Sequence, residues 1–410
     1  MLLPAESARR APTRRSFILV TAAFLVTMIG TTLPTPLYPL YQARMGYSQL
    51  TVTLIFATYA FGVIGGLIAF GSWSDQLGRR RVLLGGLTFA VASNLVFIAS
   101  PELAALLAAR LLSGLSAGIF AGTATVAVVE QAPPAWKNGA TLAATATNML
   151  GLGLGPAIGG VLAQYAPWPL DLPYALHLGA CLLVAVGLFC VPETVRPPTR
   201  VRLHRQPLGI PPRVRDVFVP AGIAGFAGTA VLGLFTAVLH TVAQKLLGIE
   251  NLALVGLIIF TLFIASALGQ ATMGLIVPPQ RLIIGCLVLS LGALTLGLAI
   301  DRASLGLTLA GAALAGWGQG LALRSGLGAV VDASPDDRKS EVTSTFFVVL
   351  YVAISLPVLG LGATIRVTSL STAGIGFALL VAALALFAMT LLIHLRLRER
   401  RPSGERHHTD

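Results

Sequence analysis

Apolar runs of about 20 residues follow one another along the chain, separated by short polar or Pro-rich breaks. A run of that length is what an α-helix needs to cross a lipid bilayer. The pattern predicts twelve membrane-spanning helices, at 16–40, 48–70, 82–100, 103–129, 139–164, 172–192, 217–240, 251–276, 282–300, 303–333, 342–365 and 371–395.

The start of the chain resembles a secretory signal peptide, because four arginines between residues 9 and 15 precede an apolar run. That run continues from Phe17 to Leu33, which is too long for a signal peptide, and it has no convincing cleavage site. We therefore expect a retained first helix.

One long polar segment, residues 193–216, interrupts the series and is rich in Arg and Pro, as a linker would be. The predicted organisation is then a cytoplasmic tail at 1–15 and a six-helix bundle at 16–192. A cytoplasmic linker at 193–216, a second six-helix bundle at 217–395 and a cytoplasmic tail at 396–410 follow.

Composition supports a lipid-embedded protein, since 55% of the residues are hydrophobic, 11% are charged and the mean hydropathy is +0.83. A formal net charge of +12 would favour a nucleic acid as partner if the basic residues were clustered on one surface. Here they lie at the chain ends and in alternate loops, the pattern that orients membrane proteins. We expect no nucleic acid partner.

The basic residues also predict the orientation. With the N-terminus in the cytoplasm, the Lys and Arg of the outer side are Arg44, Lys245, Arg302 and Arg366. Arg110 and Arg324 lie within helices, and every other basic residue is cytoplasmic. The positive-inside rule therefore predicts a multi-pass protein of the inner (plasma) membrane with both termini in the cytoplasm.

The two halves resemble each other in sequence. At an offset of 202, the residues Gly114, Gly118, Val128, Val129, Glu130 and Pro133 match Gly316, Gly320, Val330, Val331, Asp332 and Pro335. One helix later, at an offset of 201, Pro156 and Gly159 match Pro357 and Gly360. Parallel repeats of this kind allow alternating access, in which one half rocks on the other.

The loop after the second predicted helix reads Gly71-Ser-Trp-Ser-Asp75-Gln-Leu-Gly78-Arg79-Arg80-Arg. It resembles the loop signature of the major facilitator superfamily, except that Gln76 stands where the family usually has a basic residue. The resemblance implies that Gly71 lets two helices approach and that Asp75 faces the positive end of a neighbouring helix. Arg79 would reach a carboxylate across a cytoplasmic gate, and Glu130, after the fourth helix, is the expected partner.

The fifth predicted helix contains the pattern Gly-x-x-x-Gly-Pro-x-x-Gly-Gly, formed by Gly151, Gly155, Pro156, Gly159 and Gly160. Glycines four residues apart give a flat face for close helix packing, and Pro156 removes a backbone hydrogen bond and bends the helix. The complete pattern resembles the fifth helix of the drug/proton antiporters of the superfamily. It would seal the outer half of the interface between the two bundles and act as a hinge.

Two charges lie inside predicted helices, Arg110 in the fourth and Arg324 in the tenth. Because a charge in hydrocarbon is costly, both should face the protein interior and bind something. Arg110, which resembles the family's fourth-helix motif, is a candidate for substrate binding or proton coupling. Arg324 is a candidate for an anionic group on the substrate or for a pair with Asp332, and His240 is a further coupling candidate.

A central cavity would be lined by aromatic and polar side chains that suit a cationic or amphipathic organic compound. The candidates are Thr31, Thr32, Pro34, Tyr38, Asn148, His240, Trp317, Gln319, Phe346, Phe347 and Tyr351. His177, in the sixth helix, is expected to be a satisfied buried histidine rather than a proton carrier.

The acidic residues leave proton coupling open, because no Asp or Glu lies near the middle of a predicted helix. Proton-coupled exporters commonly use a buried carboxylate. Nucleotide-binding and metal-binding signatures are also missing, so we expect neither an enzyme nor a cofactor.

The resemblance to the superfamily covers nearly the whole chain and implies an all-α integral membrane protein, with twelve transmembrane helices in two pseudo-symmetric six-helix bundles. We expect a monomer that exports a small organic compound, drug-like or a secreted metabolite, in exchange for protons. Two alternatives stay open: import of a small metabolite by symport or uniport, and a membrane sensor that transports nothing.

Overall fold

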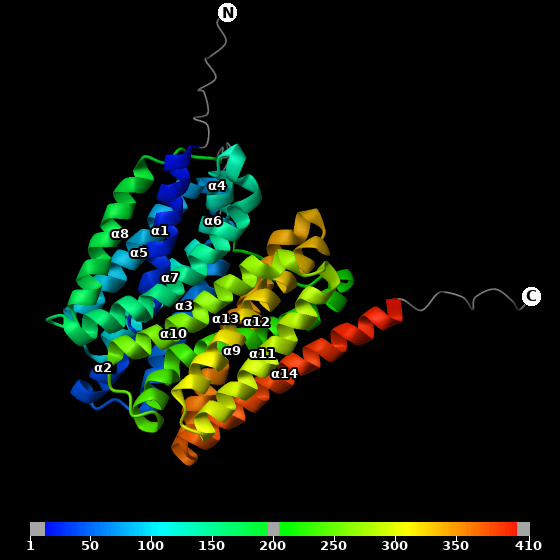
Figure 1. The fold of residues 1–410 in the computed structure, drawn as a ribbon. Coiled ribbons are helices and arrows are strands. Elements are labelled where there is room, and N and C mark those ends of the chain that lie inside the picture. Colours follow the sequence, from blue (N-terminus) through cyan, green and yellow to red (C-terminus); the bar gives the residue numbers. More distant parts are fainter. Residues whose placement is uncertain (1–12, 196–204, 400–410) are drawn as a thin grey trace, which may run out of the picture. The chain divides into compact units, whose positions relative to one another are not determined.

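The computed structural model describes residues 13–195 and 205–399, and these residues form helices without any strand (Figure 1). The twelve long helices of the described ranges are α1 (Arg14–Thr32), α3 (Gln49–Phe70), α5 (Arg79–Ala99), α6 (Leu103–Glu130), α7 (Lys137–Tyr165), α8 (Leu172–Phe189), α9 (Arg215–Leu246), α10 (Leu252–Thr272), α11 (Arg281–Asp301), α12 (Leu305–Asp332), α13 (Lys339–Val367) and α14 (Leu370–Glu399). Most of both predicted tails and the middle of the predicted linker lie outside the described residues.

Among the described residues, eleven helical segments are long and apolar enough to cross a membrane. Helix α12, with 28 residues, is long enough but less apolar, since it carries Trp317, Gln319 and Arg324 among many glycines. A helix is present at each of the twelve predicted positions, and the all-helical membrane fold is confirmed.

The first predicted span, 16–40, is wrong as a single helix. Helix α1 ends at Thr32, a 3-10 turn covers Thr35–Leu37, and the short helix α2 runs over Tyr38–Met45. Pro34 and Pro36 have no backbone N–H to continue the helical hydrogen bonds, so the chain breaks there. The break places Tyr38 in a helix of its own.

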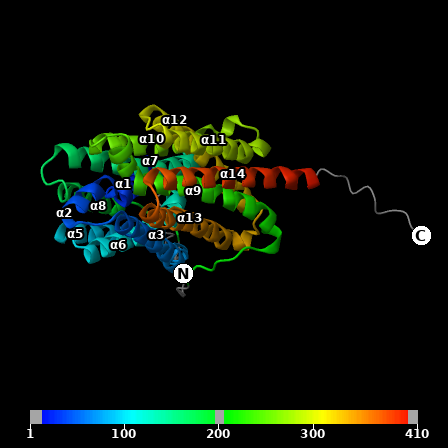
Figure 2. The ribbon, with the colours of Figure 1, turned by 90° about the horizontal axis from the view of Figure 1, so that it is seen from below.

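The described chain divides into two compact units. The first unit holds the described residues up to Pro207, with Leu239–Ala243 and Ile249–Phe260. The second holds Leu208–Val238, Gln244–Gly248 and the described residues from Thr261 on. Within the first unit α8 lies beside α5 and α1, and within the second α11 lies beside α12 and α14 (Figures 1 and 2).

Each unit contains a helix pair that packs through glycines. A methyl group on these glycines would collide with backbone carbonyl groups of the partner helix, so a larger residue would force the pair apart. The contacts are Gly114 with Tyr59 and Gly118 with Val63 between α6 and α3, and Gly316 with Leu262 and Gly320 with Ser266 between α12 and α10. Residues matched by the sequence repeat therefore make the same kind of contact in both units.

Candidate functional site

The loop motif after α3 turns at Gly78, whose φ of 100° is in a region that side chains rarely adopt. A side chain at this position would also meet the carboxylate of Glu193. Only glycine therefore suits the step from the short helix α4 (Ser74–Leu77) into α5.

Glu193 supplies the cap that the N-terminus of α5 lacks. Its Oε1 accepts the backbone N–H of Arg79 at 2.8 Å, and its Oε2 accepts that of Arg80 at 3.1 Å. Free N–H groups and the positive end of the helix dipole make this terminus favourable for a carboxylate. The carboxylate comes from beyond α8, so the contact ties the start of α5 to the end of the first six helices.

The Arg79 side chain, 13% exposed, joins two carboxylates. Its Nη1 lies 2.6 Å from Oδ1 of Asp75, and its Nη2 lies 3.2 Å from Oε1 of Glu130 at the end of α6. The hydroxyl of Thr194 also donates to Glu130. Asp75 thus pairs with Arg79, a residue of the same motif. The sequence had predicted that Asp75 would face the positive end of a neighbouring helix. The predicted contact of Arg79 with Glu130 is present, but it joins elements of the first unit.

The other motif residues hold further segments against this loop. A methyl group on Gly71 would lie 3.3 Å from Cβ of Gln206, whose backbone N–H donates to the carbonyl of Ile68 at 2.8 Å. The segment that packs closely on Gly71 is therefore non-helical. The sequence had predicted that a second helix would pack there. Arg80 donates to the carbonyls of Phe189 and Val191 at the end of α8, at 3.4 and 3.2 Å.

The glycine stripe of α7 packs directly on α1. A methyl group would lie 2.9 Å from the carbonyl oxygen of Leu25 if placed on Gly151, and 2.5 Å from that of Ile29 if placed on Gly155. On Gly159 it would lie 2.6 Å from the carbonyl oxygen of Leu33. Both sets of residues are spaced by four, so the stripe matches one face of α1 turn by turn.

Pro156 lies inside α7 and cannot donate to the carbonyl of Leu152, four residues earlier. The hydroxyl of Thr32 on α1 donates to that carbonyl at 2.8 Å. Thr32 is 5% exposed, and its hydroxyl satisfies the carbonyl group that the proline leaves without a helical donor. Its predicted place in a substrate cavity is therefore wrong in this structure, because its hydroxyl is used between α1 and α7.

The last glycine of the motif faces a different segment of the first unit. A methyl group on Gly160 would collide with the carbonyl of Leu252 at the start of α10, and one on Gly256 would collide with the carbonyl of Pro156. The fifth-helix motif therefore contacts α1 on one face and the first turns of α10 on another.

Arg110 is fully buried within the first unit, with 0% exposure. Its Nη1 donates to the carbonyl of Thr31 at 2.6 Å, while its Nε and Nη2 have no partner. The guanidinium carbon lies 4.9 Å from the ring centre of Tyr59 and 5.7 Å from that of Phe56, within the range of cation–π attraction. Because two buried N–H donor groups of this charge are unsatisfied, binding of a hydrogen-bond acceptor to them is favourable.

Other unpaired polar atoms lie in the same unit. The hydroxyls of Tyr38 and Thr35 and both ring nitrogens of His240 are buried without a partner. The ring centres of Tyr38 and His240 are 6.3 Å apart. Asn148 is half-buried on α7. The sequence predicted Tyr38, His240 and Arg110 as site residues, and the first unit holds all three.

The predicted site residues of the second unit are mostly engaged in its own structure. Nη1 of Arg324 donates to the carbonyl of Gln270 at 2.6 Å, and Asp332 is exposed. The ion pairs of the described residues do not include one between these two, so that predicted alternative is not formed. Trp317 donates to the hydroxyl of Thr272 at 3.0 Å, and Gln319 accepts the hydroxyl of Ser266 at 2.6 Å.

The aromatic candidates on α13 divide between core and half-buried positions. Phe346 is fully buried in an apolar cluster, with its ring 5.8 Å from that of Phe218, so the predicted cavity position is wrong for it. Phe347 packs on the same cluster from a half-buried position, and Tyr351 is half-buried.

Comparison with known proteins decides the family. A model described as the Major Facilitator Superfamily matches residues 20–356, which is most of the chain. The chain belongs to the Major Facilitator Superfamily. Like other members of this family of transporters, it is a multi-pass membrane protein.

Relatives of this MFS transporter include two named putative multidrug resistance protein MdtD. The one from Salmonella typhimurium is 28% identical over 156 residues, covering 38% of this chain and 33% of the relative. The one from Cronobacter sakazakii is 27% identical over 150 residues, covering 37% and 32%. The matches thus span about a third of the length of these relatives.

The solved structure of the human organic anion transporter MFSD10 (TETRAN) is similar in fold. It superposes with a TM-score of 0.65 at 19% identity, covering 93% of this chain and 100% of that structure. At this identity the likeness concerns the fold alone.

Sequence reasoning missed several residues of this MFS transporter that hold the loop motif together. Glu193 and Thr194 stood at the start of the predicted linker, and Ser74, inside the motif, accepts Nη1 of Arg79 at 2.6 Å. The one available signal was an acidic residue directly after the sixth apolar run, close to where the cytoplasmic arginines of the motif were expected. Pairing the two requires knowing that α8 ends beside α5.

Proposed function

We propose that this MFS transporter exports a small organic compound, drug-like or a secreted metabolite, across the inner membrane in exchange for protons, by alternating access. The similarity to the putative multidrug resistance proteins MdtD supports export. The complete pattern on α7, packed tightly on α1 and on the start of α10, supports the antiporter subgroup.

The observation that carries a transport role is that Nε and Nη2 of the buried Arg110 guanidinium have no partner. A charge within a membrane span costs about 2.5–3.5 kcal/mol on insertion scales, and here two of its donors are left without an acceptor. We infer that Arg110 contacts the transported compound, with the unpaired hydroxyl of Tyr38 as a second contact.

The charges around Arg110 bear on the class of compound. The described residues include no buried Asp or Glu, so a cation bound beside Arg110 would find no buried counter-ion there. We therefore favour a neutral or anionic compound with carbonyl or carboxylate acceptors over a cationic one, whereas the sequence suggested a cationic or amphipathic compound. The rings of Tyr59 and Phe56 would contact its apolar part.

We assign the cluster of Asp75, Arg79 and Glu130 to the cytoplasmic gate. Its ion pairs are partly shielded from solvent and depend on Gly78 and Glu193 to place Arg79. Because these residues all belong to the first unit, opening of the cytoplasmic side would have to rearrange that unit itself and so break the contact between the loop and the end of α6. The pair of Arg79 with Glu130 then serves as a latch.

We also propose cytoplasmic N- and C-termini, two pseudo-symmetric six-helix bundles joined by the linker at 193–216, and a monomer. The excess of Lys and Arg in alternate loops supports the orientation. Import by symport or uniport is the competing function, and a sensor that transports nothing is another. Each of these alternatives predicts a different result in a flux measurement: import predicts flux in the opposite direction, and a sensor predicts none.

The test is transport in inside-out vesicles that contain the purified chain, a pH-sensitive dye and an imposed proton gradient. A panel of neutral, anionic and cationic compounds is added to wild type and to Arg110→Gln. We expect compound-dependent loss of the acidic interior, reduced at least about tenfold in the variant, because a charge-assisted hydrogen bond is worth about 1.5–3 kcal/mol.

The control variant is Arg366→Gln, which removes an exposed arginine at the end of α13. It should transport like the wild type. Uptake into right-side-out vesicles, with no proton movement in the inverted ones, would refute the antiporter and favour import. Absence of flux in both orientations for every compound would favour the sensor.

A further inference from the structure

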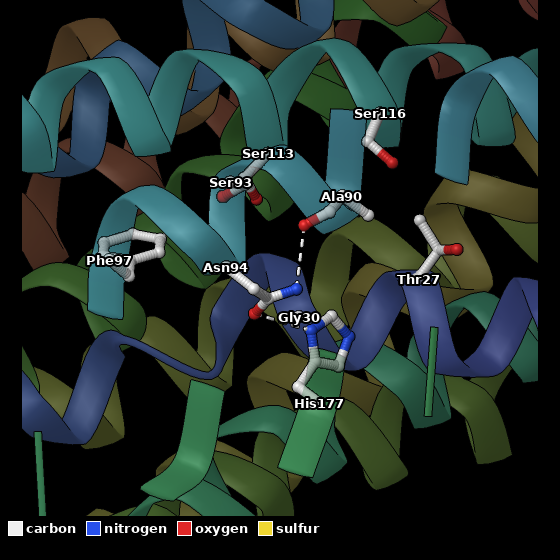
Figure 3. Close-up of a pocket in the computed structure, with 9 residues that line it drawn as sticks. All are labelled: Thr27, Gly30, Ala90, Ser93, Asn94, Phe97, Ser113, Ser116 and His177. Carbon is white, nitrogen blue, oxygen red and sulfur yellow. Dashed lines mark hydrogen bonds between the residues drawn. The ribbon is translucent and has the colours of Figure 1, made fainter. Parts of the chain in front are cut away.

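His177, on α8, lies inside the first unit among α1, α5 and α6 (Figure 3). The side chain is 7% exposed. Its Nδ1 lies 3.0 Å from Oδ1 of Asn94, and its Nε2 lies 2.9 Å from the carbonyl oxygen of Val26. A methyl group on Gly30 would overlap the imidazole ring, so α1 has a glycine where the ring needs room.

Both hydrogen-bond partners of the ring are acceptors. The amide nitrogen of Asn94 donates to the carbonyl of Ala90 at 2.8 Å, which turns its oxygen towards His177. The carbonyl of Val26 can only accept. A neutral imidazole has one N–H and can satisfy only one of the two contacts, whereas the imidazolium has two and satisfies both.

Rotating the Asn94 amide does not remove the conflict. Its nitrogen would then donate to a neutral ring, but its oxygen would face the carbonyl of Ala90, another acceptor. The three groups Ala90, Asn94 and Val26 therefore favour a ring that carries two protons. Burial acts in the opposite direction, because it penalises a charge without a counter-ion.

The surroundings supply no fixed charge that decides between the two forms. Helix α5 faces the ring with the uncharged Asn94 and Ser93, and α1 with Thr27. On α8 itself, Sγ of Cys181 lies 3.7 Å from Nε2. Helix α6 contributes Ser113 and Ser116 to the cavity lining. The charged residue of α6 closest to them in the sequence is Arg110, whose Nη1 donates to the carbonyl of Thr31 on α1. The described residues bury no carboxylate, so a proton added to His177 is not neutralised.

A small cavity lies beside His177. Its volume is about 10 Å³, close to what one water needs, and the hydroxyls of Ser93, Ser113 and Ser116 line it together with His177. The hydroxyl of Ser116, one of the lining residues, is buried without a partner in the protein.

We propose that His177 is the proton-binding group of this transporter, taking up a proton from one side of the membrane and releasing it to the other as the transporter alternates, with a water bound in this cavity carrying the proton to and from the ring. In the neutral ring one acceptor loses its hydrogen bond, and in the charged ring both are satisfied. Proton binding thus changes how strongly α8 is held to α5 and α1. The proposal rests on the proposed proton exchange, for which the sequence offered no mid-helix carboxylate.

The first test detects the protons on the ring directly. The purified chain, labelled with ¹⁵N-histidine in lipid, is followed by nitrogen NMR between about pH 5 and pH 8, and His177→Gln assigns the signal. We expect an imidazolium with two N–H groups at the acidic end that becomes neutral at the basic end. A ring with a single proton over the whole range would overturn the proposal.

Asn94→Asp provides a second variant in case His177→Gln fails to fold. A carboxylate at Oδ1 would hold the ring in its charged form, so we expect that form to persist at a proton concentration at least about tenfold lower. An unchanged titration would count against the assignment.

The second test distinguishes the role of His177 from the proposed proton exchange on which it rests. In vesicles, His177→Gln should lower compound-dependent proton flux at least about tenfold while exchange of labelled for unlabelled compound continues. His394→Gln, at an exposed position of α14, should behave as wild type. Equal proton flux in His177→Gln and wild type would refute His177, whereas absence of proton flux in wild type would refute the exchange itself.

Discussion

At the scale of single residues, α7 depends on one hydroxyl from another helix. Thr32 donates to the carbonyl that Pro156 leaves without a helical partner. Replacement of Thr32 by Val keeps the volume of the side chain but leaves that buried carbonyl unsatisfied. We expect a loss of about 1–3 kcal/mol in the free energy of unfolding, measured by thermal unfolding in detergent with tryptophan fluorescence.

Thr32→Ser is the matched control, because it retains the hydroxyl and should lose much less. If Val and Ser variants unfold alike, the hydroxyl does not stabilise α7. The sequence predicted Thr32 in a cavity because aromatic and polar side chains together suit an organic compound. Which carbonyl Thr32 reaches depends on how α1 and α7 are aligned, and spacing within one helix does not determine that.

At the scale of elements, the packing of α7 on α1 allows no side chain at three successive turns. Gly155→Ala would place a methyl group 2.5 Å from the carbonyl oxygen of Ile29, so the helices must move apart. We expect a cost of about 1–3 kcal/mol in the free energy of unfolding and a loss of transport. Unfolding curves measure the first effect and vesicle flux measures the second, on the same preparation.

Gly139, near the start of the same helix, is the matched control, since a methyl group there would meet nothing within 4 Å. Gly139→Ala should be neutral or slightly stabilising, by up to about 1 kcal/mol. Equal effects at the two positions would show that helix propensity, and not contact with α1, governs both.

Much of this element was predictable from the sequence. Glycines at every fourth residue predict a flat face, and a flat face in a membrane helix predicts close packing. The partner was not predictable, because several neighbouring helices could have occupied that face. The same holds for Arg79, whose contact with Glu130 was expected from the motif while Glu193 and Thr194 were not.

At the scale of the whole molecule, helix number followed from hydropathy, since each helix must satisfy its own backbone in lipid. Orientation stays a prediction from the loop charges. A fluorescent protein that folds only in the cytoplasm should be bright when fused after the last residue. Alkaline phosphatase, active only outside the cytoplasm, should be active when fused in the connection at Gly248, between α9 and α10.

The reverse pattern, a dark carboxyl-terminal fusion and an inactive phosphatase at Gly248, would invert the topology and move the gate cluster to the outer side. A phosphatase fused directly after Gly78, in a predicted cytoplasmic loop, should be inactive and serves as the internal control. The boundary at Thr32 shows the limit of hydropathy, because a run of apolar residues conceals the break that prolines impose.

The cap on α5 has a consequence for how the protein is made. The carboxylate that accepts the N–H groups of Arg79 and Arg80 belongs to Glu193, more than a hundred residues further along the chain. On the ribosome, α5 therefore enters the bilayer with these groups facing water, and its start stays unanchored while α6, α7 and α8 are synthesised. The cap itself can form only after Glu193, beyond α8, has left the exit tunnel, so its formation shows that the first six long helices have been synthesised.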